Sequence, residues 1–579
     1  MTALAVVIVL MFVGVIPAPD FVVARLTGAK PAEYSARYYP RDTLAYYWLT
    51  LTPGDGQLSD SREIFQFLNE YTVFEDWLDE IQDDFEEETS IDFDAEVRPW
   101  IGVDFSAALI DFDVDNEEIE AAATVAVRDR EAAAEFLDDW LDYLEDESGS
   151  DFDEDSSGEF EIWIDENNPQ AYALSDNLLV VATSEDVLDD VINRVEGDGR
   201  NSLADVNNFA AARNALPERR FTSLYLNAQS IWDELYEELS NFDGWAVAGF
   251  GDIEENLPEW MAASAGWVEQ GLVVESITPA EAPGVYGSPK KGDPAGLLPA
   301  NTLAYIAASF DPDIDAWRAE LRNQEMTDVI PEFSSSVDDF NDELAFLADE
   351  MGLPEPPKLR RTSELDDALD LGLWWISELV GIDFESDFFD YLDGELVLSV
   401  SDLDLERLAE DPNRYPVDAT AMLSYHSENA NSLAETMENI ADFIEDELDL
   451  DSDTVSVRTG SYATIFELPE SRYEPGYMML GNYLAFGTTE DALKDLASSD
   501  NRLAMDQEYR RGMSHISGEW EFLAYLDLRS ITGQIDFADI DLSRAQRKLL
   551  QEVFGVAAFS LYQDGDYSRS KFVLTLFPD

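Results

Sequence analysis

The chain has 579 residues, of which 45% are apolar and 12% aromatic, and its 34 basic against 125 acidic side chains give a net charge of −91. This length suits two to four domains with sizeable cores, and the apolar content excludes a disordered acidic tail. Nucleic acid phosphates repel such a polyanion, which excludes nucleic acid as a partner. The chain has no cysteine, so disulfides and thiolate chemistry are excluded too.

Residues 1–24 contain an uninterrupted apolar run from Ala3 to Ile16. Fourteen residues are short for a membrane span, which needs about 20, and the alternatives are a cleaved signal peptide or a buried helix. The basic residues follow the run, and the positive-inside rule taken alone would place the rest of the chain in the cytoplasm. We expect an apolar N-terminal helix that acts as a membrane segment, anchor or signal, followed by a tether over residues 25–37, with the bulk of the chain extracytoplasmic.

The next stretch, "YPRDTLAY" at Tyr39–Tyr46, returns as "LPANTLAY" ending at Tyr305. Between them, "SREIFQFLNEYTVFEDWLDEIQDDF" has apolar residues at helical spacing from Ile64 to Phe85, which predicts a core-facing helix. Further landmarks then recur in the same order. Trp100-Ile101 is echoed by Tyr391-Leu392, and "AEFLDDWLDYLEDE" (134–147) aligns without gaps with "AETMENIADFIEDE" (434–447).

Each copy continues with an apolar strand that runs into a helix, "LLVVATSEDVLDDV" and "YLAFGTTEDALKDL". Thr183 and Thr488 are the predicted N-caps, with Asp186 and Asp491 three residues later. Each copy closes with a predicted hairpin, and Asp564-Gly565 is a two-residue turn pattern in the second. We interpret the ordered landmarks as an internal duplication.

The Pro/Gly-rich segment 280–296 predicts a linker between a first repeat lobe, 38–279, and a second, 297–579. The second copy carries roughly thirty additional residues before Ile382, including the helical pattern "LDDALDLGLWWISELV". The short connections between strands predict an α+β fold of two related lobes, each a mostly antiparallel sheet with helices packed on one face.

The apolar N-terminus, the "YPRDTLAY" opening, the segment Ile382–Val400 and "GTTEDALKDL" together resemble the bacterial domain of unknown function 3352 family. The resemblance covers nearly the whole chain after the apolar segment. It implies a bacterial protein, often with an N-terminal membrane segment and with no assigned reaction, so it transfers no catalytic residue.

Acidic triplets begin at Asp111, Asp151 and Asp311, but none meets the spacing of a calcium loop. The two histidines, His426 and His515, stand in unrelated contexts, and Gly249-Phe-Gly251 lacks the third glycine of a dinucleotide fingerprint. We therefore assign no catalytic, cofactor-binding or metal-binding residue and expect no cofactor.

Two functions remain open. The first is a non-catalytic, membrane-tethered binding or structural module of the cell envelope, with a small apolar ligand or an envelope protein as partner and an aromatic-lined pocket between the lobes as the ligand site. The alternative is a tethered or secreted carboxylate-dependent hydrolase, which would concentrate buried acids with shifted pKa values in one lobe or between the lobes.

Overall fold

The computed structural model describes residues 32–50, 89–113, 118–241, 257–280, 288–322, 333–403, 417–535 and 553–576, except 198, 219, 269–270, 352, 361–364, 449, 459–460, 470, 499–500 and 517, together with residues 82 and 85–87. The predicted membrane segment, most of the tether and nearly all of the predicted helix Ile64–Phe85 lie outside these residues. Among the residues described, no helix has the length and apolar character needed to cross a bilayer.

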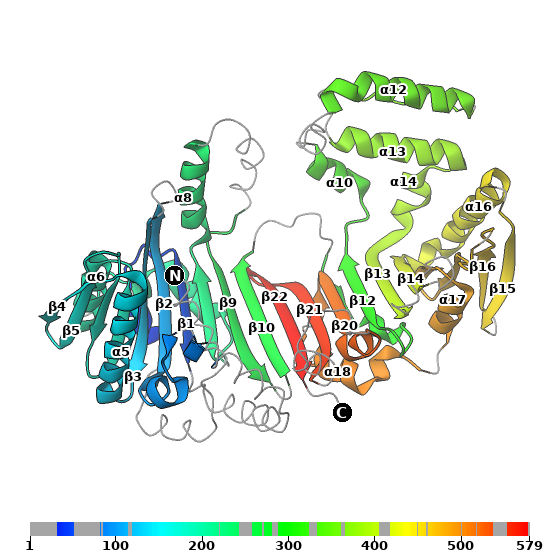
Figure 1. Ribbon diagram of the computed structural model, residues 1–579. Coiled ribbons are helices and arrows are strands. Elements are labelled where there is room, and N and C mark those ends of the chain that lie inside the picture. Colours follow the sequence, from blue (N-terminus) through cyan, green and yellow to red (C-terminus); the bar gives the residue numbers. More distant parts are fainter. Residues whose placement is uncertain are drawn as a thin grey trace. The chain divides into compact units, whose positions relative to one another are not determined.

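The described chain forms two compact units, and each is an α+β arrangement on an antiparallel sheet (Figure 1). The division falls between Glu281 and Ala282, within the predicted linker, and the final strand belongs to the first unit. Every strand pairing that the structure gives is antiparallel, as the short connections predicted.

The strands of the first unit are paired in the order β4-β5-β6-β7-β3-β2-β1-β8-β9-β10-β22. A 3₁₀ helix, η1 (Ala32–Arg37), occupies the end of the predicted tether, with Ala36 fully buried. The bounds are β1 Ala45–Thr50, β2 Ile101–Asp113, β3 Glu118–Val127, α5 Arg130–Ser148, β4 Phe152–Ser157, β5 Phe160–Asp165, β6 Ala171–Leu174, β7 Leu178–Ala182, α6 Glu185–Glu196, α7 Asn207–Ala215, β8 Thr222–Leu226, α8 Ala228–Asn241, β9 Met261–Val268, β10 Gly271–Pro279 and β22 Tyr567–Leu576.

The strands of the second unit follow the order β15-β16-β17-β18-β14-β13-β12-β20-β21, which repeats the order of the first nine strands above. Their bounds and those of the helices are β12 Ala304–Ser309, α10 Ile314–Leu321, α12 Phe333–Glu350, α13 Leu365–Val380, α14 Phe384–Asp387, β13 Leu392–Asp402, β14 Asp418–Tyr425, α16 Ala430–Leu448, β15 Ser452–Arg458, β16 Ser461–Phe466, β17 Gly476–Leu480, β18 Tyr483–Gly487, α17 Glu490–Ala497, α18 Gln507–Met513, β20 Phe522–Asp527, α19 Leu528–Thr532 and β21 Phe554–Asp564. A short pair, β11 (Lys290–Lys291) with β19 (Glu519–Trp520), completes the unit.

The returning motif forms the central strand of each sheet. Tyr46 on β1 lies opposite Tyr225 on β8, and Tyr305 on β12 lies opposite Tyr525 on β20. A third ring completes each cluster, Phe209 from α7 in the first unit and Tyr509 from α18 in the second. The repeated motif is therefore a packing motif, because its tyrosines are buried among aromatic side chains.

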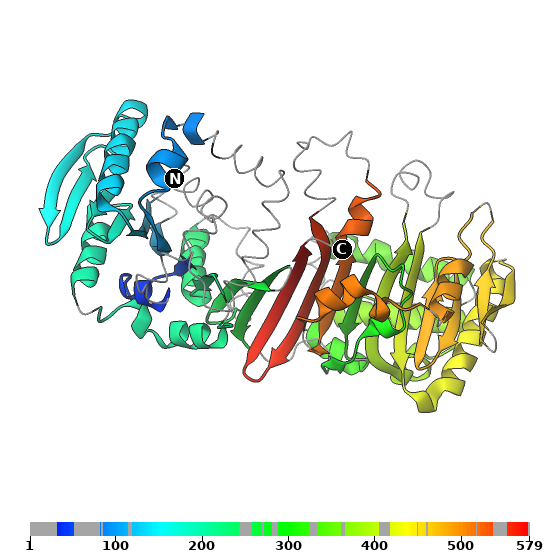
Figure 2. The same ribbon diagram turned by 90° about the horizontal axis from the view of Figure 1, so that it is seen from below.

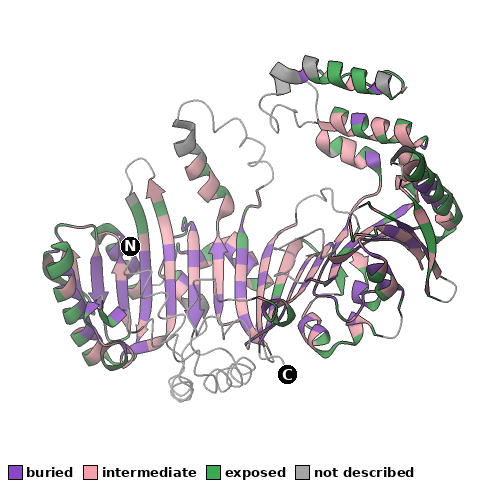
Figure 3. Cartoon of the chain, turned by 45° about the vertical axis from the view of Figure 1, so that its right-hand side comes forward, coloured by how far each residue is buried: buried purple, intermediate pink, exposed green. Residues whose placement is uncertain are grey.

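Helices cover both faces of each sheet, and the prediction of helices on one face is wrong. Successive strand residues point to opposite faces, and both faces are apolar here. On β3, Ala122 belongs to a core cluster with α6 and α7, whereas Ala123 belongs to a separate cluster with α5. In the second unit, Met478 lies in the cluster with α17 and α18, and its neighbour Tyr477 packs in the cluster with α16. The buried residues in Figure 3 accordingly follow the strands.

The N-caps of α6 and α17 are one residue later than predicted. Ser184 and Thr489, rather than Thr183 and Thr488, accept the helix N–H bonds. The earlier threonines hold strands together instead, since Thr183 Oγ1 accepts from Ala121 N at 2.9 Å and Thr488 Oγ1 accepts from Ala419 N at 2.9 Å. The final turn is shifted in the same way, to Gly565-Asp566, and Gly565 has a φ of 63° that glycine adopts without strain.

The last strand completes the first unit by pairing with β10 along nine residues, from Gly271 opposite Thr575 to Pro279 opposite Tyr567. Figures 1 and 2 show the red final strand beside the green β10. Buried Glu275 lies opposite Lys571 and accepts from Arg569 Nη1 at 2.6 Å, with Lys571 Nζ 3.1 Å from its second oxygen. Two cations thus neutralise the buried carboxylate at this strand pair.

We predict that Lys571→Glu lowers the free energy of unfolding of the first unit by about 2–4 kcal/mol, because it places a second carboxylate opposite buried Glu275. Urea denaturation followed by circular dichroism measures this. Arg130→Glu is the matched control, since it makes the same charge change at the exposed Arg130–Glu161 pair, and its effect should stay within about 1 kcal/mol. Equal effects of the two variants would contradict the role given to the Glu275 cluster.

Candidate functional site: an apolar pocket beneath α16

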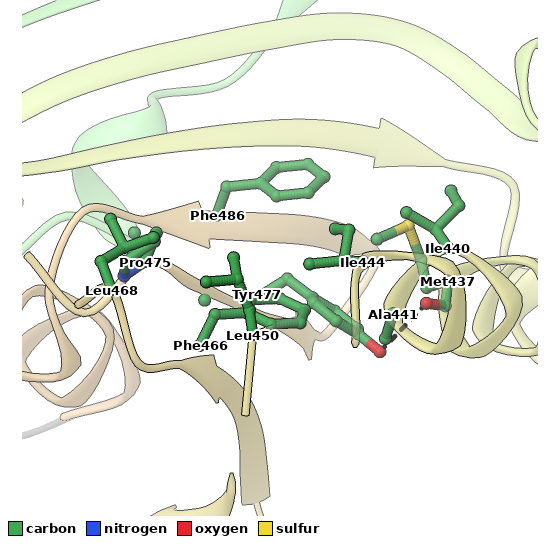
Figure 4. A pocket seen from close by; sticks show the side chains of 12 residues that line it. Met437, Ile440, Ala441, Ile444, Leu450, Phe466, Leu468, Pro475, Tyr477 and Phe486 are labelled. Atoms are coloured by element: carbon green, nitrogen blue, oxygen red, sulfur yellow. Dashed lines mark hydrogen bonds between the residues drawn. The ribbon is translucent and has the colours of Figure 1, made fainter. Parts of the chain in front are cut away.

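A cavity of about 320 Å³ lies in the second unit between helix α16 and strands β16, β17 and β18 (Figure 4). This volume is at the lower end of the range of small-molecule sites. Its walls are almost entirely apolar. The twelve lining residues are Met437, Ile440, Ala441, Ile444, Leu450, Phe466, Leu468, Pro475, Gly476, Tyr477, Phe486 and Gly487.

Local sequence explains why these side chains meet. On α16, Met437, Ala441 and Ile444 recur at helical spacing on the face toward the sheet. On the strands, Tyr477 lies opposite Phe486, and both point to the face that α16 covers. Several lining residues are only half-buried, among them Ile440, Leu468 and Phe486, so the pocket opens to solvent.

Tyr477 carries the one hydroxyl among the lining residues. Its hydroxyl donates to the carbonyl oxygen of Met437 at 3.2 Å, drawn as a dashed line in Figure 4. Burial raises the pKa of Tyr477, and the carboxylates of Glu438, Asp442 and Glu445 raise it further. The phenol is therefore neutral at physiological pH and already bonded to the protein, so none of the lining residues carries a charge.

The corresponding place in the first unit is filled. Helices α5 and α16 have equal length and align without gaps, so Trp140 corresponds to Ile440 and Leu141 to Ala441. Trp140 is 8% exposed, and its indole N–H donates to the hydroxyl of Tyr172 at 3.4 Å. The second unit has isoleucine and alanine where the first has tryptophan and leucine. These smaller side chains do not occupy the volume that Trp140 and Leu141 fill in the first unit.

The polar groups around Trp140 are also replaced by apolar ones. In the first unit, Tyr172 donates to Gln170 at 2.9 Å, and buried Asp165 accepts backbone N–H bonds from Asn167 and Asn168. One backbone hydrogen bond occurs in both units, from Asp165 N to Gln170 O in the first and from Phe466 N to Pro475 O in the second. Phe466 therefore stands where the first unit has Asp165, and Pro475 stands where it has Gln170. The second unit therefore has a larger and less polar space.

Half-buried acids that could serve a hydrolase occur in both units rather than in one. Asp104 on β2 lies opposite Thr50, and Glu395 on β13 lies opposite Ser309, each next to an irregularity of its strand. Burial raises the pKa of both carboxyl groups, and Tyr483 donates to Glu395 at 3.0 Å. Because the same position is acidic in both units, we interpret these carboxyl groups as parts of the repeated strand geometry.

The acidic triplets that begin at Asp151 and Asp311 have structural roles or face solvent, and the triplet that begins at Asp111 lies partly outside the described residues. Asp153 and Asp155 are exposed on β4, and Asp313 caps α10 by accepting from Asp315 N. Where the structure describes the chain, no group of three or more histidine and acidic side chains is placed to hold a metal ion. His426 is half-exposed, with its Nδ1 3.6 Å from Asp393. Gly249-Phe-Gly251 lies outside the described residues.

The pocket residues were not predicted as a site from the sequence. The gapless alignment of 134–147 with 434–447 already contained the relevant pattern, because the side chains at 440 and 441 are smaller than those at 140 and 141. A ligand pocket between the lobes was expected instead, and the pocket described here lies within one unit.

Fold and site define an α+β protein with a large antiparallel sheet and an apolar pocket. A family model described as "Protein of unknown function (DUF3352)" matches residues 2–339. The chain belongs to this family, which confirms the family resemblance. The match includes the "YPRDTLAY" opening but ends before Ile382–Val400 and "GTTEDALKDL", so it is shorter than the nearly full-length resemblance expected from the sequence.

Other comparisons add little. No curated protein matches the sequence. Two solved structures, described as crystal forms III and IV of TP0453, are similar at 10% and 12% identity with TM-scores of 0.23 and 0.22; each match covers 44% of this chain and 83% or 82% of the other. At these TM-scores the matches support no argument about fold or function.

We predict that Ile440→Trp/Ala441→Leu, which introduces the residues of the first unit, raises the free energy of unfolding of the second unit by about 1–2 kcal/mol, because it fills the cavity. The reciprocal variant Trp140→Ile/Leu141→Ala should destabilise the first unit by about 3–5 kcal/mol. Differential scanning calorimetry measures both. A destabilised Ile440→Trp/Ala441→Leu variant would show that the space is not available to side chains.

Proposed function

We propose that this protein is a non-catalytic binding module of the cell envelope, in which the pocket beneath α16 holds a small apolar ligand. The observation that carries the proposal is the pocket itself. Its walls are apolar, it opens to solvent, and the equivalent space in the first unit is occupied by Trp140. Exposing such walls to water is costly, and a bound apolar molecule would offset this cost.

Internal duplication is part of the same proposal. The strand order, the paired tyrosines and the lengths of α5 and α16 agree between the units, and the sequence landmarks occur in one order. After duplication, one copy would have kept a filled core for stability, and the other would have exchanged its bulky residues for a ligand space. This division of roles explains why just one copy has the small residues at 440 and 441.

We further propose that residues 1–24 tether the protein to the membrane, with the bulk of the chain extracytoplasmic. The apolar run from Ala3 to Ile16 supports this, as does the strongly acidic composition, which suits a hydrated surface outside the cell. A tethered module with an apolar pocket would bind molecules close to a lipid surface.

Ligand binding is tested with the uncharged fluorophore N-phenyl-1-naphthylamine and the full chain. We expect a fluorescence increase that saturates at one probe per chain and is lost in Ile440→Trp/Ala441→Leu. Ile306→Trp, which adds a tryptophan at a half-exposed position on β12, is the control and should bind like the parent. Probe binding that survives filling of the pocket would exclude it as the site.

The tether is tested by cell fractionation of the full chain and of a variant lacking residues 2–24. We expect the full chain in the membrane fraction, and we expect protease added to cells with an opened outer layer to degrade it. We expect the shortened chain in the soluble cytoplasmic fraction. A full chain that is soluble or protected from protease would contradict the proposed location.

A further inference from the structure

The helix that closes the pocket has a row of carboxylates beside its apolar face. Glu438, Asp442 and Glu445 are exposed and spaced by four and three residues, so they lie along one side of α16. Each directly follows a pocket residue, Met437, Ala441 and Ile444. The apolar wall of the pocket and the acidic row therefore run next to each other along the same helix.

The acidic row is close to the polar end of the pocket. The hydroxyl of Tyr477 bonds the carbonyl oxygen of Met437, one residue before Glu438. Burial raises the pKa of the Tyr477 phenol, and all three carboxylates add to this rise. A ligand that fills the pocket and extends past Tyr477 would place its end group in the field of these carboxylates.

We propose that the pocket selects an apolar molecule with a positively charged end, such as an alkylammonium, over a neutral molecule of the same size and strongly over an anionic one. This inference rests on the proposed ligand-binding function and specifies the chemical class of its ligand. The apolar wall supplies affinity through burial, and the acidic row supplies the choice of charge.

The net charge of −91 attracts cations to the whole surface, so a local effect needs a matched comparison. The first unit provides it. Asp138, Asp142 and Glu145 occupy the equivalent positions on α5, and they are exposed as well. Neutralising either row changes the net charge equally, but the row on α5 lies beside a space that Trp140 fills.

The experiment measures displacement of N-phenyl-1-naphthylamine from the full chain by decylammonium, 1-decanol and decanoate, each below its aggregation concentration, at pH 7.5 and low salt. We expect decylammonium to bind at least about tenfold more tightly than decanoate, with decanol between them, and expect 1 M NaCl to reduce the difference. Glu438→Gln/Asp442→Asn/Glu445→Gln should reduce the preference, and Asp138→Asn/Asp142→Asn/Glu145→Gln should leave it unchanged.

The outcomes separate the two proposals. Equal binding of the three decyl compounds, or an equal loss of preference in both triple variants, would overturn charge selection by α16 and leave the pocket in place. Failure of decanol and of the fluorophore to bind at all would overturn the proposed function, and charge selection with it.

Discussion

An antiparallel sheet that is apolar on both faces must be covered on both faces, and the rest of the structure follows from this constraint. Strand β3 illustrates it, since alternate residues enter cores with α6 and α7 on one face and with α5 on the other. The second unit repeats the arrangement with α17, α18 and α16. Two separate cores per unit allow one core to change while the other maintains the fold.

The pocket arises in the core that α16 covers. The opposite core of the second unit contains the buried rings of Tyr305, Tyr509 and Tyr525 in mutual contact. Tyr305 and Tyr509 share a hydrogen bond of 2.7 Å, and Tyr509 donates to Asp293 at 2.5 Å. A rigid core on one face can hold the strands in place while the other face carries a cavity. Binding and stability are in this way assigned to different faces of one sheet.

The antiparallel pairing and the helices α5, α6, α13, α16 and α17 could be predicted from the sequence, because each depends on local periodicity or on short connections. The position of β22 could not, since pairing of a final strand with β10 depends on contacts between residues almost three hundred positions apart. Helices on both faces were missed because the alanines of β3, such as Ala122 and Ala123, give no clear alternation.

The candidate site shows a similar limit. Comparison of Trp140 with Ile440 shows that the second unit has a smaller side chain at this position. A smaller side chain leaves a pocket only if the neighbouring residues do not move into the space. The N-cap of α6 could not be assigned from the sequence, because Thr183 and Ser184 are both residue types that cap helices. In the structure Thr183 accepts from Ala121 N, and Ser184 is the N-cap.

The central claim is that the second unit has a real apolar cavity where the first unit has a filled core. The most direct measurement is a crystal structure of the protein under xenon pressure, because xenon binds where the surrounding walls are apolar. The account predicts xenon between α16 and Tyr477 and none at Trp140 beneath α5. Absence of xenon beneath α16, with side chains closed over the space, would contradict it.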